Sequence, residues 1–133
     1  MNHMQRFGEV AMILELRLPD IVPQMTGATA ECLFAEAGDA LRLGSKLVDL
    51  RVDLSSAFAQ ECPPISYYRI VLREKAYLRQ INLQPGEYVG LDGPVALLSS
   101  SPDEPLDQTP ERPLRITVAG ILRHDGMFSG GDL

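Results

Sequence analysis

An internal repeat constrains the fold of this chain more than any other feature of its sequence. When Gly38 is set against Gly86, an offset of 48 residues, two stretches with the same pattern align. Each stretch has an acidic residue directly after the glycine and a second glycine between two pairs of apolar positions. Counting 3, 5, 9 and 12 residues from each glycine, the matching apolar positions are Leu41, Leu43, Leu47 and Leu50, then Val89, Leu91, Val95 and Leu98.

The repeated unit predicts two similar sheets that pack face to face. A glycine next to an acidic residue is typical of a turn, and alternating apolar positions are typical of half-buried strands. A strand is expected just before each turn, at residues 31–35 and 79–83. One copy cannot bury its apolar face alone, so the two copies are expected to cover each other around a pseudo-twofold axis. We expect Leu41, Leu43 and Leu47 to point into the core.

Further strands are expected outside the repeat. Apolar residues alternate within residues 10–18, and residues 67–73 and 114–122 are rich in strand-forming side chains. Cys32 shares a predicted strand with apolar residues, so we expect it to be a small buried side chain. The serine- and proline-rich residues 99–113 have the composition of a solvated linker.

Length and composition bound the remaining possibilities. A chain of 133 residues suggests one domain, and its 11 glycines and 10 prolines favour a turn-rich all-β fold. The net charge of −6 argues against nucleic acid as a partner. No apolar run approaches the ~20 residues of a membrane span, and residues 1–10 lack the pattern of a secretion signal. Two cysteines form neither a disulfide framework nor a zinc site, so no metal is expected and a cytoplasmic location is the default.

Three segments of the first half resemble a known family. They are Leu-Pro-Asp-Ile at 18–21, Met-Thr-Gly-Ala-Thr at 25–29, and Glu-Ala-Gly-Asp at 36–39 followed by Leu-Gly at 43–44. This pattern resembles the biotinyl/lipoyl carrier domain, most closely the lipoyl domain of 2-oxo acid dehydrogenase acyltransferases. The resemblance extends over roughly residues 12–98. It implies a barrel-sandwich hybrid, in which two short antiparallel sheets are related by a pseudo-twofold repeat.

The resemblance also implies where the chemistry of the family would lie. Family members carry lipoate on a lysine in an Asp-Lys-Ala turn at the tip of a hairpin. The corresponding residues here are Asp53, Leu54 and Ser55. A leucine has no amine to acylate, so neither lipoate nor biotin is expected on this degenerate hairpin. The hairpin is also longer than in the family, because Ala76 follows Asp53 by 23 residues (76 − 53).

Two other residues keep a carrier role open as the alternative. Lys75 lies in a Glu-Lys-Ala sequence, a rough match to the attachment motif, and Cys62 lies in the enlarged loop. Modification of either would make the chain an acyl or carboxyl carrier in a complex of the 2-oxo acid dehydrogenase or carboxylase type. Against this, Lys75 follows the hairpin instead of standing at its tip, and no His or Lys lies near Cys62 in sequence to activate the thiol.

The sequence therefore predicts a lipoyl-like domain at residues 1–98, a linker at 99–113, and a C-terminal strand and loose tail at 114–133. We expect no catalytic residues and no cofactor. The expected function is protein interaction or assembly, with Phe58, Tyr67 and Tyr68 as candidate surface residues, since aromatic side chains are enriched in interfaces. The partner is a protein of unknown identity, a homo-oligomer is left open, and a small-molecule site at the hairpin mouth is a weaker alternative.

Overall fold

The computed structural model describes residues 11–54 and 65–122, and within these ranges it contains ten β-strands and no helix. The strands are β1 (Ile13–Arg17), β2 (Gly27–Leu33), β3 (Ala40–Leu41), β4 (Lys46–Asp53), β5 (Ile65–Leu72), β6 (Ala76–Ile81), β7 (Tyr88–Gly90), β8 (Pro94–Ser99), β9 (Arg112–Pro113) and β10 (Ile116–Ile121).

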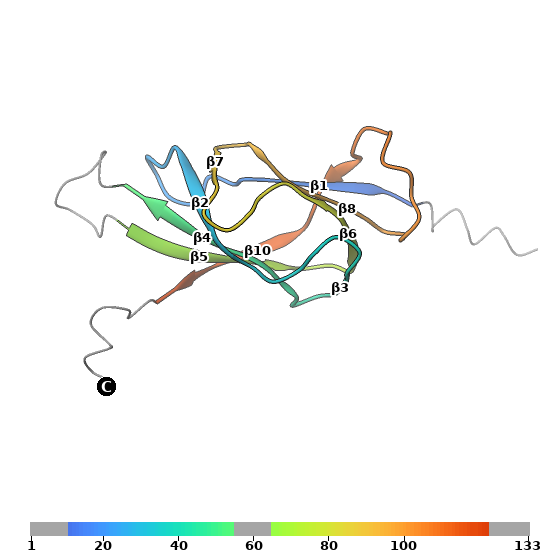
Figure 1. Cartoon of the computed structure of the whole chain (residues 1–133), viewed down its shortest axis with the longest axis horizontal. Coiled ribbons are helices and arrows are strands. Elements are labelled where there is room, and N and C mark those ends of the chain that lie inside the picture. The colour runs from blue at the N-terminus through green and yellow to red at the C-terminus, as the bar shows by residue number, and fades with distance from the viewer. Residues whose placement is uncertain (1–10, 55–64, 123–133) are drawn as a thin grey trace, which may run out of the picture.

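The strands form two five-stranded sheets that pack as a sandwich (Figure 1). Sheet A has the order β3-β6-β8-β1-β9, and sheet B has the order β10-β5-β4-β2-β7. Neighbouring strands are antiparallel except β1 and β9, which are parallel. The two sheets do not close into a barrel. The expected all-β fold of two antiparallel sheets is confirmed.

The predicted twofold repeat appears directly in the strand order. Exchanging β1–β4 with β5–β8 converts the order β3-β6-β8-β1 into β7-β2-β4-β5, which is sheet B read in reverse. The two additional strands obey the same relation, because β9 lies beside β1 and β10 lies beside the equivalent β5. The repeat therefore relates one sheet to the other.

The turns of the two halves contain the same internal hydrogen bond, which explains why an acidic residue follows each glycine. The backbone N–H of Glu36 donates to the Asp39 carboxylate, with 2.9 Å between N and Oδ2. In the second half the N–H of Gln84 donates to the Glu87 carboxylate over the same distance, 2.9 Å. Each carboxylate closes its own turn, so the acidic residues of the repeat have a structural role.

The glycines of these turns adopt a backbone conformation that other residues rarely do. Gly38 and Gly86 have φ angles of +103° and +91°, in the left-handed region where a Cβ is strained. The N–H of Gly38 donates to the carbonyl of Leu78, and the N–H of Gly86 donates to the carbonyl of Ala30. Since 78 − 30 is again the repeat offset of 48, the two halves hold each other by reciprocal bonds.

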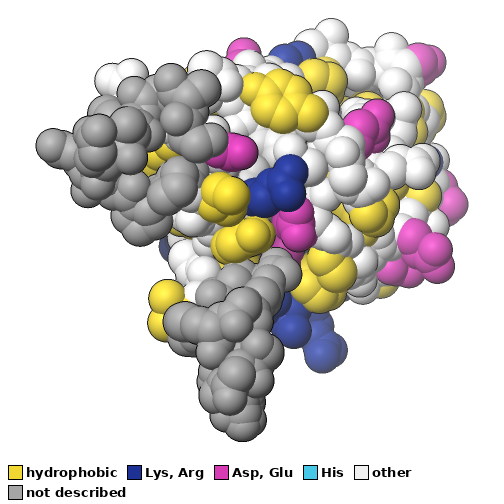
Figure 2. Space-filling model, turned by 60° about the vertical axis from the view of Figure 1, so that its left-hand side comes forward, with side chains coloured by type: hydrophobic (Ala, Val, Ile, Leu, Met, Phe, Trp, Pro, Cys, Tyr) yellow, Lys and Arg dark blue, Asp and Glu magenta, His cyan; other side chains and the backbone are white. Residues whose placement is uncertain are grey.

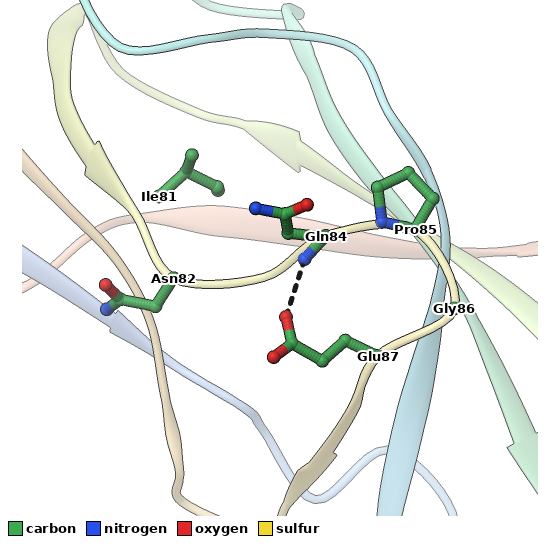
Figure 3. A pocket seen from close by; sticks show the side chains of 6 residues that line it. All are labelled: Ile81, Asn82, Gln84, Pro85, Gly86 and Glu87. Atoms are coloured by element: carbon green, nitrogen blue, oxygen red, sulfur yellow. Dashed lines mark hydrogen bonds between the residues drawn. The ribbon is translucent and has the colours of Figure 1, made fainter.

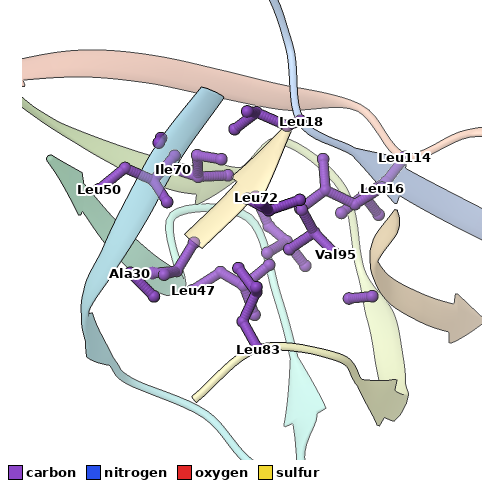
Figure 4. Close-up of a cluster of buried hydrophobic side chains, with 14 of the residues drawn as sticks. Leu16, Leu18, Ala30, Leu47, Leu50, Ile70, Leu72, Leu83, Val95 and Leu114 are labelled. Carbon is purple, nitrogen blue, oxygen red and sulfur yellow. The ribbon is translucent and has the colours of Figure 1, made fainter. Parts of the chain in front are cut away.

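The core lies between the sheets and draws on both halves of the repeat (Figure 4). Four of the aligned apolar positions, Leu47, Leu50, Val95 and Leu98, are 0% exposed. The prediction that Leu43 points into the core is wrong, because its side chain is 69% exposed. Strand β3 ends at Leu41, and Leu43 already belongs to the turn before β4.

A bulge in β2 overturns the expected burial of Cys32, which is exposed. Ala28 and Ala30 are buried, and strict alternation would place Cys32 on the same face. The pairing of β2 with β4 shifts register between Ala30 and Cys32, so that Leu33 packs against the core instead. One extra residue in a strand exchanges the two faces for every residue that follows.

The C-terminal segment adds one strand to each sheet. The strand expected within residues 114–122 is confirmed as β10, which pairs with β5 of the same chain along its whole length. The preceding segment, expected to be a linker, runs along sheet A. The N–H of Glu111 donates to the carbonyl of Ile13, and Arg79 donates to the carbonyl of Glu104. The domain boundaries themselves stay a prediction.

Candidate functional site

The end of the β4–β5 hairpin is where the resemblance would place an attachment site. Leu54 directly follows β4, and its side chain is 7% exposed and belongs to the core cluster. Asp53 is exposed at the end of the strand. Ser55, Phe58 and Cys62 lie outside the described residues. The side chain of Leu54, where the resemblance would place an attachment lysine, is therefore packed inward.

Lys75 lies far from this hairpin end. It is exposed in the turn between β5 and β6. Strand β5 has 8 residues, which at ~3.3 Å per residue separate the turn from the hairpin end by roughly 26 Å. The structure does not bring Lys75 together with Leu54: Lys75 follows one end of β5, and Leu54 lies at the hairpin end that precedes the other.

Tyr67 and Tyr68 point to opposite faces of β5. Tyr68 packs against the core, whereas Tyr67 lies on the outer face of sheet B, in register with Arg51 and Ile121. Near Tyr67, Ile65 is 40% exposed and Leu122 is 83% exposed. We call Ile65, Tyr67, Ile121 and Leu122 the hairpin-end patch. Figure 2 shows this end of the molecule, where hydrophobic side chains gather beside charged ones.

An ion pair on the outer face of sheet B was not predicted from the sequence. Arg69 Nε lies 2.7 Å from Asp49 Oδ1, and Arg69 Nη2 lies 3.0 Å from Asp49 Oδ2. The hydrogen bond to Asp49 raises the pKa of the Arg69 guanidinium. The ring of Phe34 lies 5.1 Å from this guanidinium and 5.3 Å from the Lys46 ammonium, within the range of cation–π contact.

The only signal for this pair in the sequence is a charged residue inside an apolar run, at Asp49. Its partner could not be identified, because the register of β4 against β5 depends on the intervening loop, and a shift of one residue would move Arg69 to the other face. The pair neutralises both charges, so it fits a role in fixing the sheet better than a role in catalysis.

A second ion pair fastens the C-terminal segment to the sandwich. Arg112 donates two hydrogen bonds to Glu74, at 2.6 Å to Oε1 and 2.9 Å to Oε2. The backbone N–H of Arg115 also donates to Glu74 Oε2, at 2.8 Å. The hydrogen bond from Arg112 holds the pKa of Glu74 below its ordinary value, although partial burial opposes this. The pair joins the β5–β6 turn to the segment that leads into β10.

Hollows of about 500, 430 and 350 Å³ lie among the described residues. The hollow of about 500 Å³ is lined by the turn at residues 81–87, and Figure 3 shows that the Glu87 carboxylate there is bonded within the turn. The second, about 430 Å³, lies between β1 and residues 110–116. Among its charged side chains, Arg17 pairs with Glu15 and donates to the carbonyl of Asp92, and Arg112 binds Glu74. In these two hollows Glu87, Arg17 and Arg112 are therefore bonded to other groups of the protein.

Titratable side chains within residues 11–54 and 65–122 form ion pairs and no metal-binding cluster. No three His, Cys, Asp or Glu side chains of these ranges gather in a way that could hold a metal ion. Both histidines, His3 and His124, lie outside the ranges. Ion pairs account for the shifted pKa values of Arg17, Arg69, Glu74 and Arg112. The pairs of Arg69 with Asp49 and of Arg112 with Glu74 join different elements, whereas Arg17 pairs with Glu15 of its own strand.

Comparison with known proteins identifies no relative: no family model, curated protein or solved structure matches the chain. Within the described ranges, no helix has the length and apolar character needed to cross a membrane.

Proposed function

We propose that this chain is a non-catalytic lipoyl-like domain without the attachment lysine, and that it acts as a protein-interaction or assembly module. The observation that carries the proposal is Leu54, which is 7% exposed at the position where the resembled family displays its lysine. A ligase needs an amine that it can reach, and a leucine packed into the core supplies neither the amine nor the access.

The hairpin-end patch is the surface that we assign to interaction. Tyr67 and Ile121 lie opposite each other on the outer face of sheet B, and Ile65 and Leu122 add exposed apolar surface beside them. Exposed apolar side chains around an aromatic ring are typical of protein interfaces. Tyr68 packs against the core and is assigned to folding. Phe58 lies outside the described residues and stays a candidate.

A cytoplasmic location is part of the proposal. Cys32 is a free, exposed thiol within the described residues. Disulfides are rare in reducing compartments, and an exposed free thiol persists more readily there.

The intact mass of the protein purified from its own source tests the proposal. We expect the mass of the unmodified chain. A covalent adduct would contradict the proposal and support the alternative, a carrier modified at Lys75 or Cys62. Peptide mapping would then assign the adduct to one of these two residues.

A pair of surface variants tests the interaction role directly. In native extract we expect the parent to elute as part of a larger assembly. We expect the double variant Ile65→Asp and Tyr67→Ala to elute at a smaller apparent size, because it loses the partner. The control is Leu43→Asp, which changes a leucine in the turn before β4 that is 69% exposed, more than the 40% of Ile65. Size-exclusion chromatography with immunodetection gives the readout, and an unchanged elution of the double variant would argue against this patch.

A further inference from the structure

The four sheet edges of the sandwich are unequal. Three of the edge strands are very short: β3 and β9 have 2 residues each, and β7 has 3. The fourth, β10, has 6 residues, and no described strand lies beyond it. Proteins usually protect long edges with charged residues, proline or a bulge, because an unpaired edge can template another strand. The other three edges are protected by their shortness, and β9 also contains Pro113.

Strand β10 carries none of these protective features. Its sequence, Ile-Thr-Val-Ala-Gly-Ile, has no charged residue and no proline. Its pairing with β5 runs without a register shift from Ile116 to Ile121. Four of its six residues, Ile116, Thr117, Val118 and Ile121, are β-branched, which favours an extended conformation. The strand is therefore a regular and uncharged edge in a chain whose net charge is −6.

The hydrogen bonds to β5 define which backbone groups face outward. The N–H of Arg73 donates to the carbonyl of Arg115, so these two residues form a hydrogen-bonded pair. Antiparallel pairing alternates, so Thr117, Ala119 and Ile121 also bond to β5. The N–H and C=O groups of Ile116, Val118 and Gly120 consequently point away from β5, toward the open edge.

We propose that this edge binds the β10 strand of a second copy of the chain, so that the two sheets B join antiparallel across a twofold axis at Val118. This proposal rests on the assembly role proposed above, and it assigns a partner to the β10 edge, a surface separate from the outer face that carries Ile65 and Tyr67. In this register Val118 faces Val118 of the second copy, and Ile116 faces Gly120 of the second copy. All outward-facing N–H and C=O groups of the three residues are then paired, each residue pair exchanging two hydrogen bonds.

The side chains and charges of the strand suit a copy of itself. The bulky Ile116 lies opposite a glycine and Thr117 lies opposite Ala119, so in these two pairs the larger side chain faces a small one. The absence of charge on β10 matters because two identical acidic chains repel each other, and like charges placed opposite one another destabilise a strand pair. The twofold pairing places Arg115 opposite Ile121, so even the nearest charge faces an apolar residue.

Two substitutions at one position give a matched test. Gly120→Pro removes an N–H that the proposed pair uses and leaves the bonds from β10 to β5 intact, since proline is tolerated at a strand edge whose N–H faces solvent. Gly120→Ala keeps the N–H, and the added Cβ would lie 3.9 Å from Tyr68, an ordinary contact. Sedimentation of the full-length chain should give a dimer for the parent and Gly120→Ala, and a monomer for Gly120→Pro.

Amide hydrogen exchange locates the contact independently. In the dimer we expect Ile116, Val118 and Gly120 to be protected, and on dilution to the monomer we expect these three to lose protection at least tenfold. The alternating residues Thr117, Ala119 and Ile121 should stay protected in both states, because they bond to β5.

Three results would overturn this proposal. The first is a monomer at about 1 mM, a concentration at which even a millimolar dissociation constant populates the dimer. The second is a dimer that Gly120→Pro leaves intact. The third is a dimer in which amide protection does not alternate along β10. Each is measured on the unmodified chain. An adduct in the intact mass would reject the proposed function without affecting this test, and a monomer would reject the dimer without restoring a carrier role.

Discussion

Leu54 matters both for the stability of the fold and for the proposed loss of carrier chemistry. Its side chain is 7% exposed and belongs to the core cluster together with Val52, which is 0% exposed. Burial of a leucine side chain stabilises a fold by roughly 2 kcal/mol. The position therefore contributes to stability, and a residue selected for packing is not one that a modifying enzyme can reach.

The first prediction concerns the stability contribution of Leu54. Leu54→Ala should lower the free energy of unfolding by about 2–3 kcal/mol, because it removes buried apolar surface and leaves a cavity. Urea unfolding of the purified chain measures this. The control, Leu43→Ala, changes a side chain that is 69% exposed and should stay within about 0.5 kcal/mol of the parent. Equal effects of the two changes would show that Leu54 does not support the core.

Cys32 and Leu43 show which single residues a sequence pattern places wrongly. Both belong to apolar patterns, and both are exposed. The bulge in β2 and the end of β3 at Leu41 are responsible. A bulge arises from how two strands fit each other along their whole length, so it is not encoded in the local alternation that predicts burial.

At the scale of elements, the segment after β8 is held by specific polar contacts as well as by backbone pairing. Glu74 receives hydrogen bonds from the side chain of Arg112 and from the backbone of Arg115. These bonds join the β5–β6 turn to the residues before β10. A carboxylate that accepts several bonds contributes most when it is ionised.

The second prediction is a pH dependence that follows from Glu74. The hydrogen bond from Arg112 lowers the pKa of Glu74 below the ordinary value of 4.5. A group with a lowered pKa in the folded state contributes stability above the unfolded pKa and loses it as the pH falls through the folded pKa. Stability should therefore fall below about pH 4.5 more steeply in the parent than in Glu74→Gln.

Urea unfolding at a series of pH values from 7 down to 3 measures this difference. The control is Glu36→Gln, which removes a carboxylate from an exposed residue in the turn before β3. This control should retain the slope of the parent below pH 4.5. If Glu74→Gln gives the same acid slope as the parent, the ion pair with Arg112 does not contribute to stability in solution.

At the scale of the whole molecule, two copies of a four-strand unit contribute strands to both sheets. The C-terminal segment extends both sheets at equivalent edges. Leu114 is 4% exposed, and Ile116 and Val118 pack against the core. Sheet B would end at β5 without them. The segment after the repeat is therefore part of the sandwich, although the repeat alone accounts for eight of the ten described strands.

The third prediction is that the chain needs this segment to fold. A version that ends at Gln108 loses three packed apolar side chains, worth about 5 kcal/mol together, which is comparable with the whole stability of a small domain. We expect it to lack a cooperative unfolding transition by circular dichroism. A synthetic peptide of residues 109–122, added in excess, should restore the transition. Cooperative unfolding of the shortened chain alone would make β9 and β10 dispensable.

The sequence by itself determined the fold class, because the 48-residue repeat, the alternation of apolar residues and the Gly-acid turns are local patterns that each specify a strand or a turn. It also placed Leu54 where the resemblance implies an attachment lysine. Only the tertiary structure decided that this leucine is buried, that Asp49 meets Arg69, and that β10 presents an open edge. These features depend on strand register and on which strand ends a sheet, and both are settled by long-range pairing between segments that no local pattern relates.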